Sequence, residues 1–180
     1  ITTNWWMLLA IPLGLLSGFA GKAFVGAILG ARMLFRHRIR MPEWMKPGLG
    51  GLGVGIVGVT VAFLSGGNLG IFGIGYGDLD AALNGRLLAL TVVTLLLAGK
   101  CVATILAYGS GGSGGLFAPT LFIGGMLGAL VGLLAQPIFQ YESEIVGAMA
   151  LLGMGAFFAA VIRCPMTSIV IIWEMTGQYA

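Results

Sequence analysis

The sequence predicts an all-α integral membrane protein made of tilted and broken transmembrane helices, and three observations support this fold class. Hydrophobic residues make up 58% of the 180 residues, charged residues make up 8%, and glycine occupies 32 positions. A soluble domain carries about 25% charged residues to coat its surface, so the composition excludes one. It also excludes a disordered chain, which is poor in apolar residues. The glycines do not recur at every third position, which excludes a collagen-like chain.

The first expected membrane segment covers residues 5–31 and is interrupted only by Lys22. At about 1.5 Å per residue, a helix of this length crosses a hydrocarbon core of about 30 Å with some tilt. The loop of residues 32–46 follows, and it holds the basic cluster of the chain: Arg32, Arg36, His37, Arg38, Arg40 and Lys46. The positive-inside rule places this loop, from Arg32 to Lys46, in the cytoplasm. A contact with acidic lipid is the alternative use of these charges.

The remaining apolar segments are uneven in length. They cover residues 48–64, 87–108, 120–134, 145–162 and 166–175. Between the first two, residues 65–84 are rich in glycine and are expected to form an outer loop with one or two short helices. Several segments are expected to be too short to cross a membrane alone. Such segments suggest broken helices that meet inside the membrane, where protein or a water-filled cavity covers their backbone.

Glycines also recur at four-residue spacing inside the expected helices. The pairs and triplets are Gly14/Gly18, Gly26/Gly30, Gly51/Gly55 and Gly124/Gly128/Gly132. Small residues at this spacing allow two helix backbones to approach closely, so each set predicts a helix-packing face.

One glycine-rich segment has a different character, because it joins two apolar segments without any charged residue. It consists of Gly109, Ser110, Gly111, Gly112, Ser113, Gly114 and Gly115, followed by Leu116, Phe117, Ala118 and Pro119. A flexible linker in lipid would leave many N–H and C=O groups unpaired. We therefore expect a tight backbone turn that leads into a helix, with Pro119 in the first helical turn. The free N–H groups and partial positive charge of that helix N-terminus predict an anion-binding site.

The same segment resembles a known family. Gly115-Leu116-Phe117-Ala118-Pro119 fills the G-x-F-x-P signature of the CLC chloride channels and chloride/proton antiporters, and residues 159–168 and 173–176 resemble the late helices of that family. The resemblance implies that residues 1–180 form a single transmembrane region, equivalent to most of the second of two inverted repeats. The first repeat, the final helices, the gating glutamate and the late tyrosine are then outside this chain. It also implies that the backbone N–H groups of Leu116 and Phe117 coordinate the anion.

The resemblance further implies a function and partners. The function is passage of chloride or a similar anion through the cell membrane, as in voltage-gated chloride channels. The partners are chloride, the lipid bilayer, the remaining half of the same subunit and a second subunit in a homodimer; neither nucleic acid nor a cofactor is expected. The sequence does not distinguish a channel from an antiporter, and it does not identify the anion. The alternative is a structural helix-packing module of another membrane transporter, without an ion site of its own.

The remaining polar residues predict no catalytic or metal site. Lys100 lies inside a membrane segment, where it gives electrostatic support to the anion path or pairs with Glu174 as a structural partner. A serine nucleophile at Ser110 or Ser113 needs a nearby base, and the single histidine, His37, lies in the basic loop. We therefore expect no enzyme. Two cysteines stand apart from each other and are expected to be buried small hydrophobic residues: Cys101 and Cys164.

Overall fold

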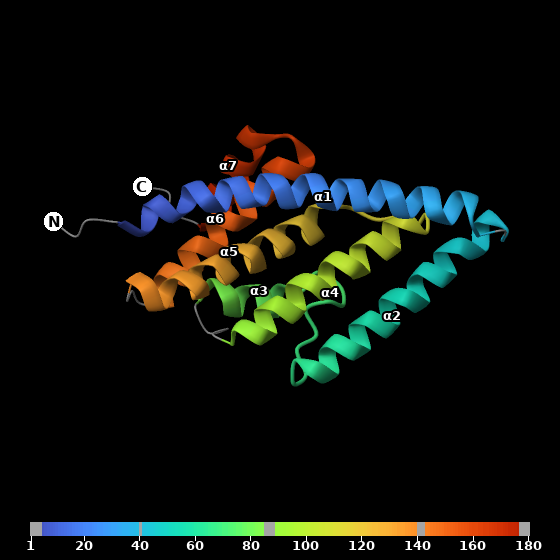
Figure 1. Ribbon diagram of the computed structural model, residues 1–180, viewed down its shortest axis with the longest axis horizontal. Helices are drawn as coiled ribbons and strands as arrows, with labels where there is room; N and C mark the ends of the chain where they lie inside the picture. Colours follow the sequence, from blue (N-terminus) through green and yellow to red (C-terminus); the bar gives the residue numbers. More distant parts are fainter. Residues whose placement is uncertain (1–4, 40, 85–88, 140–142, 177–180) are drawn as a thin grey trace.

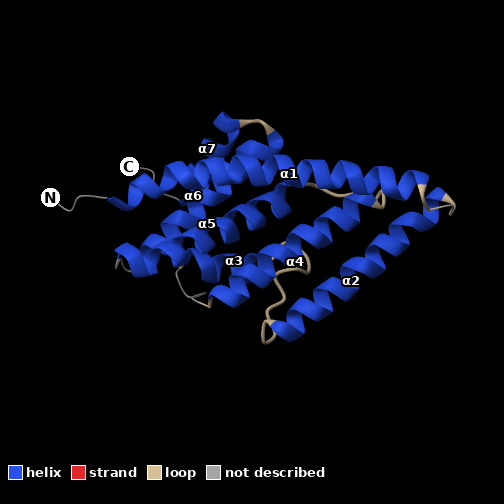
Figure 2. Ribbon diagram, viewed as in Figure 1, coloured by secondary structure: helices blue, strands red, loops and turns tan. Residues whose placement is uncertain are grey.

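The computed structural model describes residues 5–39, 41–84, 89–139 and 143–176, and these residues contain helices and loops but no strand (Figure 2). The helices are η1 (Trp5–Leu9), α1 (Ala10–His37), η2 (Glu43–Met45), α2 (Lys46–Leu64), α3 (Tyr76–Leu83), α4 (Leu90–Gly109), α5 (Phe117–Phe139), α6 (Ser143–Ile162) and α7 (Pro165–Thr176). This confirms the predicted all-α class and the short helix in the loop between the second and third membrane segments.

Five helical stretches in the described part of the chain are long and apolar enough to cross a membrane. They are Met7–His37, Glu43–Leu64, Leu90–Gly109, Phe117–Pro137 and Ile145–Ile162. The expectation that several segments are too short therefore holds only for the last helix, whose apolar part is Pro165–Met175. The chain is a multi-pass integral membrane protein.

The first helix is longer than expected. It continues through Arg32 and Arg36 to His37, so these basic residues lie on its last turns and not in the loop. Arginine is a strong helix former, and cations near a helix C-terminus interact favourably with its dipole. α1 runs along the length of the molecule beside α4 and α6, while α2 packs on α4 and α7 packs on α6 (Figure 1).

The centre of the molecule is the pair formed by α5 and α6. Every residue from 120 to 129 is buried, as expected for a helix that is apolar on all sides. A methyl group on Gly124 would collide with Gly153, and one on Gly128 would overlap the carbonyl of Met149. These close backbone contacts confirm the packing face predicted for Gly124, Gly128 and Gly132.

The other predicted glycine faces make no such contact within the described residues. A methyl group would meet no atom within 4 Å at Gly14, Gly18, Gly26, Gly30, Gly51 or Gly55. No described helix covers those faces, so close helix packing at these three pairs stays a prediction.

One boundary and one cysteine differ from expectation. α5 begins at Phe117, which agrees with the prediction that Pro119 lies in the first helical turn, but it continues past the expected end at residue 134, and past Pro137, to Phe139. The proline lies in the last turn, where only a short stretch of helix depends on the missing N–H. Cys164 is exposed, because it lies in the turn between α6 and α7, whereas Cys101 is partly buried.

Candidate anion site

The glycine-rich loop begins with a tight C-terminal cap on α4. Gly111 has a φ of +91°, a conformation that glycine adopts without steric cost. Its N–H donates to the carbonyl of Tyr108 at 3.1 Å, and the N–H of Gly112 donates to the carbonyl of Ala107 at 3.0 Å. This pair of bonds is a Schellman motif, which pairs the last carbonyls of a helix and reverses the chain. The first part of the loop, up to Gly112, is therefore an ordered turn.

The next helix starts beside α1, and its first residue, Phe117, is 47% exposed. In Figure 1 the loop after α4 runs back beside α1, and α5 begins part of the way along that helix. Pro119 is the third residue of α5, as predicted for the first turn. The carbonyl of Leu116 accepts from the N–H of Thr120 at 3.0 Å and from the Thr120 hydroxyl at 2.7 Å. The first turn of the helix is thus fixed in place.

The two N–H groups predicted to bind the anion belong to this turn. Among the described residues, neither the N–H of Leu116 nor that of Phe117 donates a hydrogen bond. The first N–H groups of a helix have no partner in their own helix, and they carry its partial positive charge. The Phe117 ring makes an edge contact with Phe158 of α6, with ring centroids 5.5 Å apart. The backbone of this turn is held by packing, and its donors remain uncommitted.

The other predicted loop residues divide into buried and exposed ones. Gly109 and Ser110 are buried, and the Ser110 hydroxyl donates to the carbonyl of Ala107 at 3.0 Å. Ser110 therefore contributes to the cap of α4. By contrast, Ser113, Gly114 and Gly115 are exposed.

A cavity of about 240 Å³ lies beside the first turn of α5. Phe117 and Ala118 form one side of it, and Tyr76 of α3 and Glu174 of α7 form others. The rest of its lining is apolar. The structure thus brings Glu174 of α7 close to the predicted anion turn, although Glu174 lies 57 positions after Phe117 in the sequence.

Lys100 does not line this cavity; it lies on the buried face of α4. Its ammonium group donates to the carbonyls of Gly70, Ile71 and Gly73 at 2.9, 3.1 and 2.8 Å. It also lies 4.8 Å from the centroid of the Phe122 ring. An ammonium group has three protons, so the three carbonyls use all of them. Through these three hydrogen bonds, Lys100 of α4 holds the loop that precedes α3 in contact with α4.

Two polar residues that the sequence did not single out also matter here. Asp78 accepts a hydrogen bond of 2.6 Å from the N–H of Gly70, so it supports the same loop that Lys100 holds. The hydroxyl of Tyr108 is buried without a hydrogen-bond partner among the described residues. A methyl group on Gly114 would lie 3.5 Å from this hydroxyl, so Tyr108 reaches the anion loop. The sequence signal for this role is that Tyr108 comes directly before the glycine-rich loop, at the end of α4.

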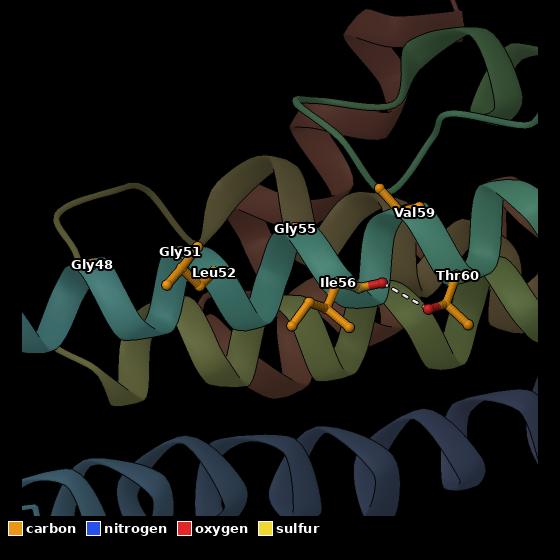
Figure 3. A pocket seen from close by; sticks show the side chains of 7 residues that line it. All are labelled: Gly48, Gly51, Leu52, Gly55, Ile56, Val59 and Thr60. Carbon is orange, nitrogen blue, oxygen red and sulfur yellow. Dashed lines mark hydrogen bonds between the residues drawn. The ribbon is translucent and has the colours of Figure 1, made fainter.

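Two further features bear on where ligands can bind. An open groove of about 670 Å³ follows the outer side of α2, lined by Gly48, Gly51, Leu52, Gly55, Ile56, Val59 and Thr60 (Figure 3). The hydroxyl of Thr60 in this groove donates to the carbonyl of Ile56 in the same helix at 2.8 Å. This hydroxyl proton is therefore not free to bind an anion. In the part of the chain that the structure describes, no three His, Cys, Asp or Glu side chains gather into a metal site.

Comparisons with known proteins agree with the signature at this turn. The profile of the family described as "Voltage gated chloride channel" matches residues 2–180. A relative from Ralstonia nicotianae (strain ATCC BAA-1114 / GMI1000), named "Putative chloride channel protein ClcB-like", is 37% identical over 177 residues. That similarity covers 98% of this chain, and the chain spans 39% of the length of the relative.

Proposed function

The chain belongs to the voltage-gated chloride channel family, the CLC family, and on that premise we propose that it forms part of a membrane pathway for chloride or a similar anion. The observation that carries this proposal is the pair of uncommitted N–H groups of Leu116 and Phe117 at the start of α5. They belong to a helix that begins part of the way along α1, next to the apolar helix α6 (Figure 1).

The chemistry of this turn suits conduction. No charged side chain occurs between Gly109 and Pro119, so the turn itself offers an anion only backbone dipoles, and the charged group beside it is the Glu174 carboxylate in the lining of the adjoining cavity. Such dipoles attract a negative charge without the full attraction of an ammonium or guanidinium group. An ion that must pass through a membrane has to bind well enough to enter and weakly enough to leave. The role we assign to the turn therefore needs no catalytic residue, metal or cofactor.

The arrangement in the membrane follows from the basic residues. We place the end of α1 and the start of α2 in the cytoplasm, because Arg32, Arg36 and Lys46 lie there. The first residues of the glycine-rich loop lie at the same end, since Gly109 contacts Ala31 closely. The rest of the ion site, in this proposal, comes from the remaining half of the same subunit, and two subunits form a homodimer in the cell membrane.

The test uses the full-length protein in liposomes loaded with chloride. Phe117→Asp places a carboxylate beside the two N–H groups, where it competes with the anion and repels it. An acidic residue in the first turn of a helix stabilises that helix, so assembly should be unaffected. We expect chloride efflux to fall at least tenfold, while Phe117→Leu, which keeps an apolar side chain, retains most of the efflux.

The same preparation separates the remaining possibilities. Proton movement against a chloride gradient identifies an antiporter, and chloride flux without proton movement identifies a channel. Unchanged efflux in Phe117→Asp would contradict the anion site. The close α5–α6 contact at Gly128 would then support the second candidate, a helix-packing module without an ion site of its own.

A further inference from the structure

A polar cavity of about 380 Å³ lies where α1 ends, α2 begins and α4 enters the glycine-rich loop. Arg32 and Arg36 line it from α1, and Glu43 and Lys46 line it from the start of α2. Residues 109–111 close the third side. Its volume is within the range of about 300–1,000 Å³ that is common for small-ligand sites. The proposed anion pathway assigns no role to this cavity.

Backbone contacts hold the walls of this cavity together. A methyl group on Gly109 would collide with the side chain of Ala31, and one on Gly50 would overlap the Ser110 side chain. α4 therefore touches both α1 and α2 directly beside the cavity. The three helix ends cannot move apart without losing these contacts, so the cavity is formed before any ligand enters.

The charges around the cavity are unbalanced. Three cationic side chains and one carboxylate line it, which leaves an excess of two positive charges. Within the described residues, the side chains of Arg32, Arg36 and Lys46 form no ion pair and no hydrogen bond with one another, with Glu43 or with any other group. Arg32 and Arg36 are four residues apart on one helix face, where like charges repel. An anionic ligand with several oxygen acceptors would relieve this repulsion and accept from the guanidinium groups.

The surroundings indicate the source of such an anion. In the sequence, Trp44 lies between the cavity residues Glu43 and Lys46, and its side chain is 79% exposed. Tryptophan favours the headgroup level of a bilayer, because its ring is apolar and its N–H is polar. Basic pockets at the ends of membrane helices bind the headgroups of acidic lipids. We propose that this cavity binds a phosphate-bearing anion, with the headgroup of an acidic phospholipid as its source.

The experiment measures lipid binding to the full-length protein. Purified protein in a neutral detergent is titrated with phosphatidylglycerol or phosphatidylcholine, and single bound lipids are counted by native mass spectrometry. We expect the wild type to bind phosphatidylglycerol more tightly. Combined Arg32→Gln, Arg36→Gln and Lys46→Gln substitutions should weaken that binding by about fivefold for each charge removed, and should leave phosphatidylcholine binding unchanged.

Two further variants guard against a general effect of charge or misfolding. Arg38→Gln removes an exposed cation of the same basic segment that does not line the cavity, so it should leave phosphatidylglycerol binding unchanged. Glu43→Gln removes the only carboxylate of the lining and should tighten the binding. Equal weakening by Arg38→Gln, or no weakening in the triple variant, would overturn the proposal.

Inorganic phosphate distinguishes the two sources of the ligand. If millimolar phosphate displaces phosphatidylglycerol from the wild type, the cavity is a site for free phosphate and the lipid assignment is wrong. If phosphate does not compete, the lipid headgroup is the ligand. Because chloride efflux is not the readout, failure of this test is independent of the proposed anion pathway.

Discussion

The N–H of Gly112 donates to the carbonyl oxygen of Ala107 at 3.0 Å, and this bond ends α4 where the chain turns back toward α5. The turn depends on Gly111, whose φ of +91° brings the N–H of Gly112 to that carbonyl. The position of the proposed anion turn, Leu116 and Phe117, thus depends on a helix cap that lies six residues before Phe117.

Gly111→Ala should disturb this cap. A left-handed conformation costs a residue with a Cβ roughly 1–2 kcal/mol, so the free energy of unfolding should fall by about that amount. Chloride efflux per folded molecule should fall as well, because the start of α5 shifts. Gly77→Ala, at an exposed position of α3 outside the proposed site, is the control, since a methyl group there meets no atom within 4 Å. Equal stability and efflux of the two variants would show that the cap does not position the turn.

Lys100→Met tests the structural role of the buried ammonium group. The substitution keeps most of the side-chain volume and leaves three carbonyls without their donor. Each unsatisfied buried acceptor costs about 1–3 kcal/mol, so the variant should be strongly destabilised in a thermal unfolding assay. Lys22→Met, at an exposed position of α1, should unfold like the wild type. A stable Lys100→Met variant with reduced chloride selectivity would instead indicate electrostatic support of the ion path.

Gly128→Ala tests the contact between α5 and α6. The added methyl group overlaps a backbone carbonyl, which cannot rotate away as a side chain can. We expect a loss of about 1–3 kcal/mol or failure to assemble, read from size-exclusion chromatography and thermal unfolding. At Gly132 the closest atom would be the Cα of Val146 at 3.2 Å, so Gly132→Ala should be milder. The reverse order would contradict the helix spacing described above.

Tyr108→Phe tests whether the buried hydroxyl beside Gly114 serves the anion. A buried hydroxyl without a partner destabilises a protein by about 1–3 kcal/mol, so its removal should raise the unfolding temperature in chloride-free buffer. If the hydroxyl donates to a bound anion, the same variant should bind chloride about tenfold more weakly. Higher stability with unchanged chloride affinity would remove Tyr108 from the site.

The local features of the anion turn could be predicted from the sequence, but several contacts could not. Pro119 lies in the first turn because its preference is set by its own backbone. The acceptors of Lys100 lie 27 to 30 positions away, in a loop whose course depends on the packing of α3 against α5 and α6. Exposed Cys164 shows that an apolar sequence neighbourhood does not ensure burial at a turn between helices.

The glycine pairs show the same limit. Gly124 and Gly128 meet α6, whereas Gly51 and Gly55 have the same spacing and meet no helix in the described residues. Spacing identifies a face that can pack closely, but only the tertiary arrangement supplies the partner. In the same way, Arg32 and Arg36 follow an apolar segment and look like a loop, although the helix continues through them.

The most direct test removes one backbone donor without adding a charge. Phe117→Pro deletes the N–H at the first position of α5, where proline fits a helix, and Phe117→Ala removes the ring but keeps the N–H. Chloride binding to the full-length variants is measured by isothermal titration calorimetry. We expect Phe117→Pro to bind chloride roughly ten- to a hundredfold more weakly than Phe117→Ala, because a hydrogen bond to a charged group is worth about 1.5–3 kcal/mol. Equal chloride affinity in the two folded variants would contradict a site built from the N–H groups of this turn.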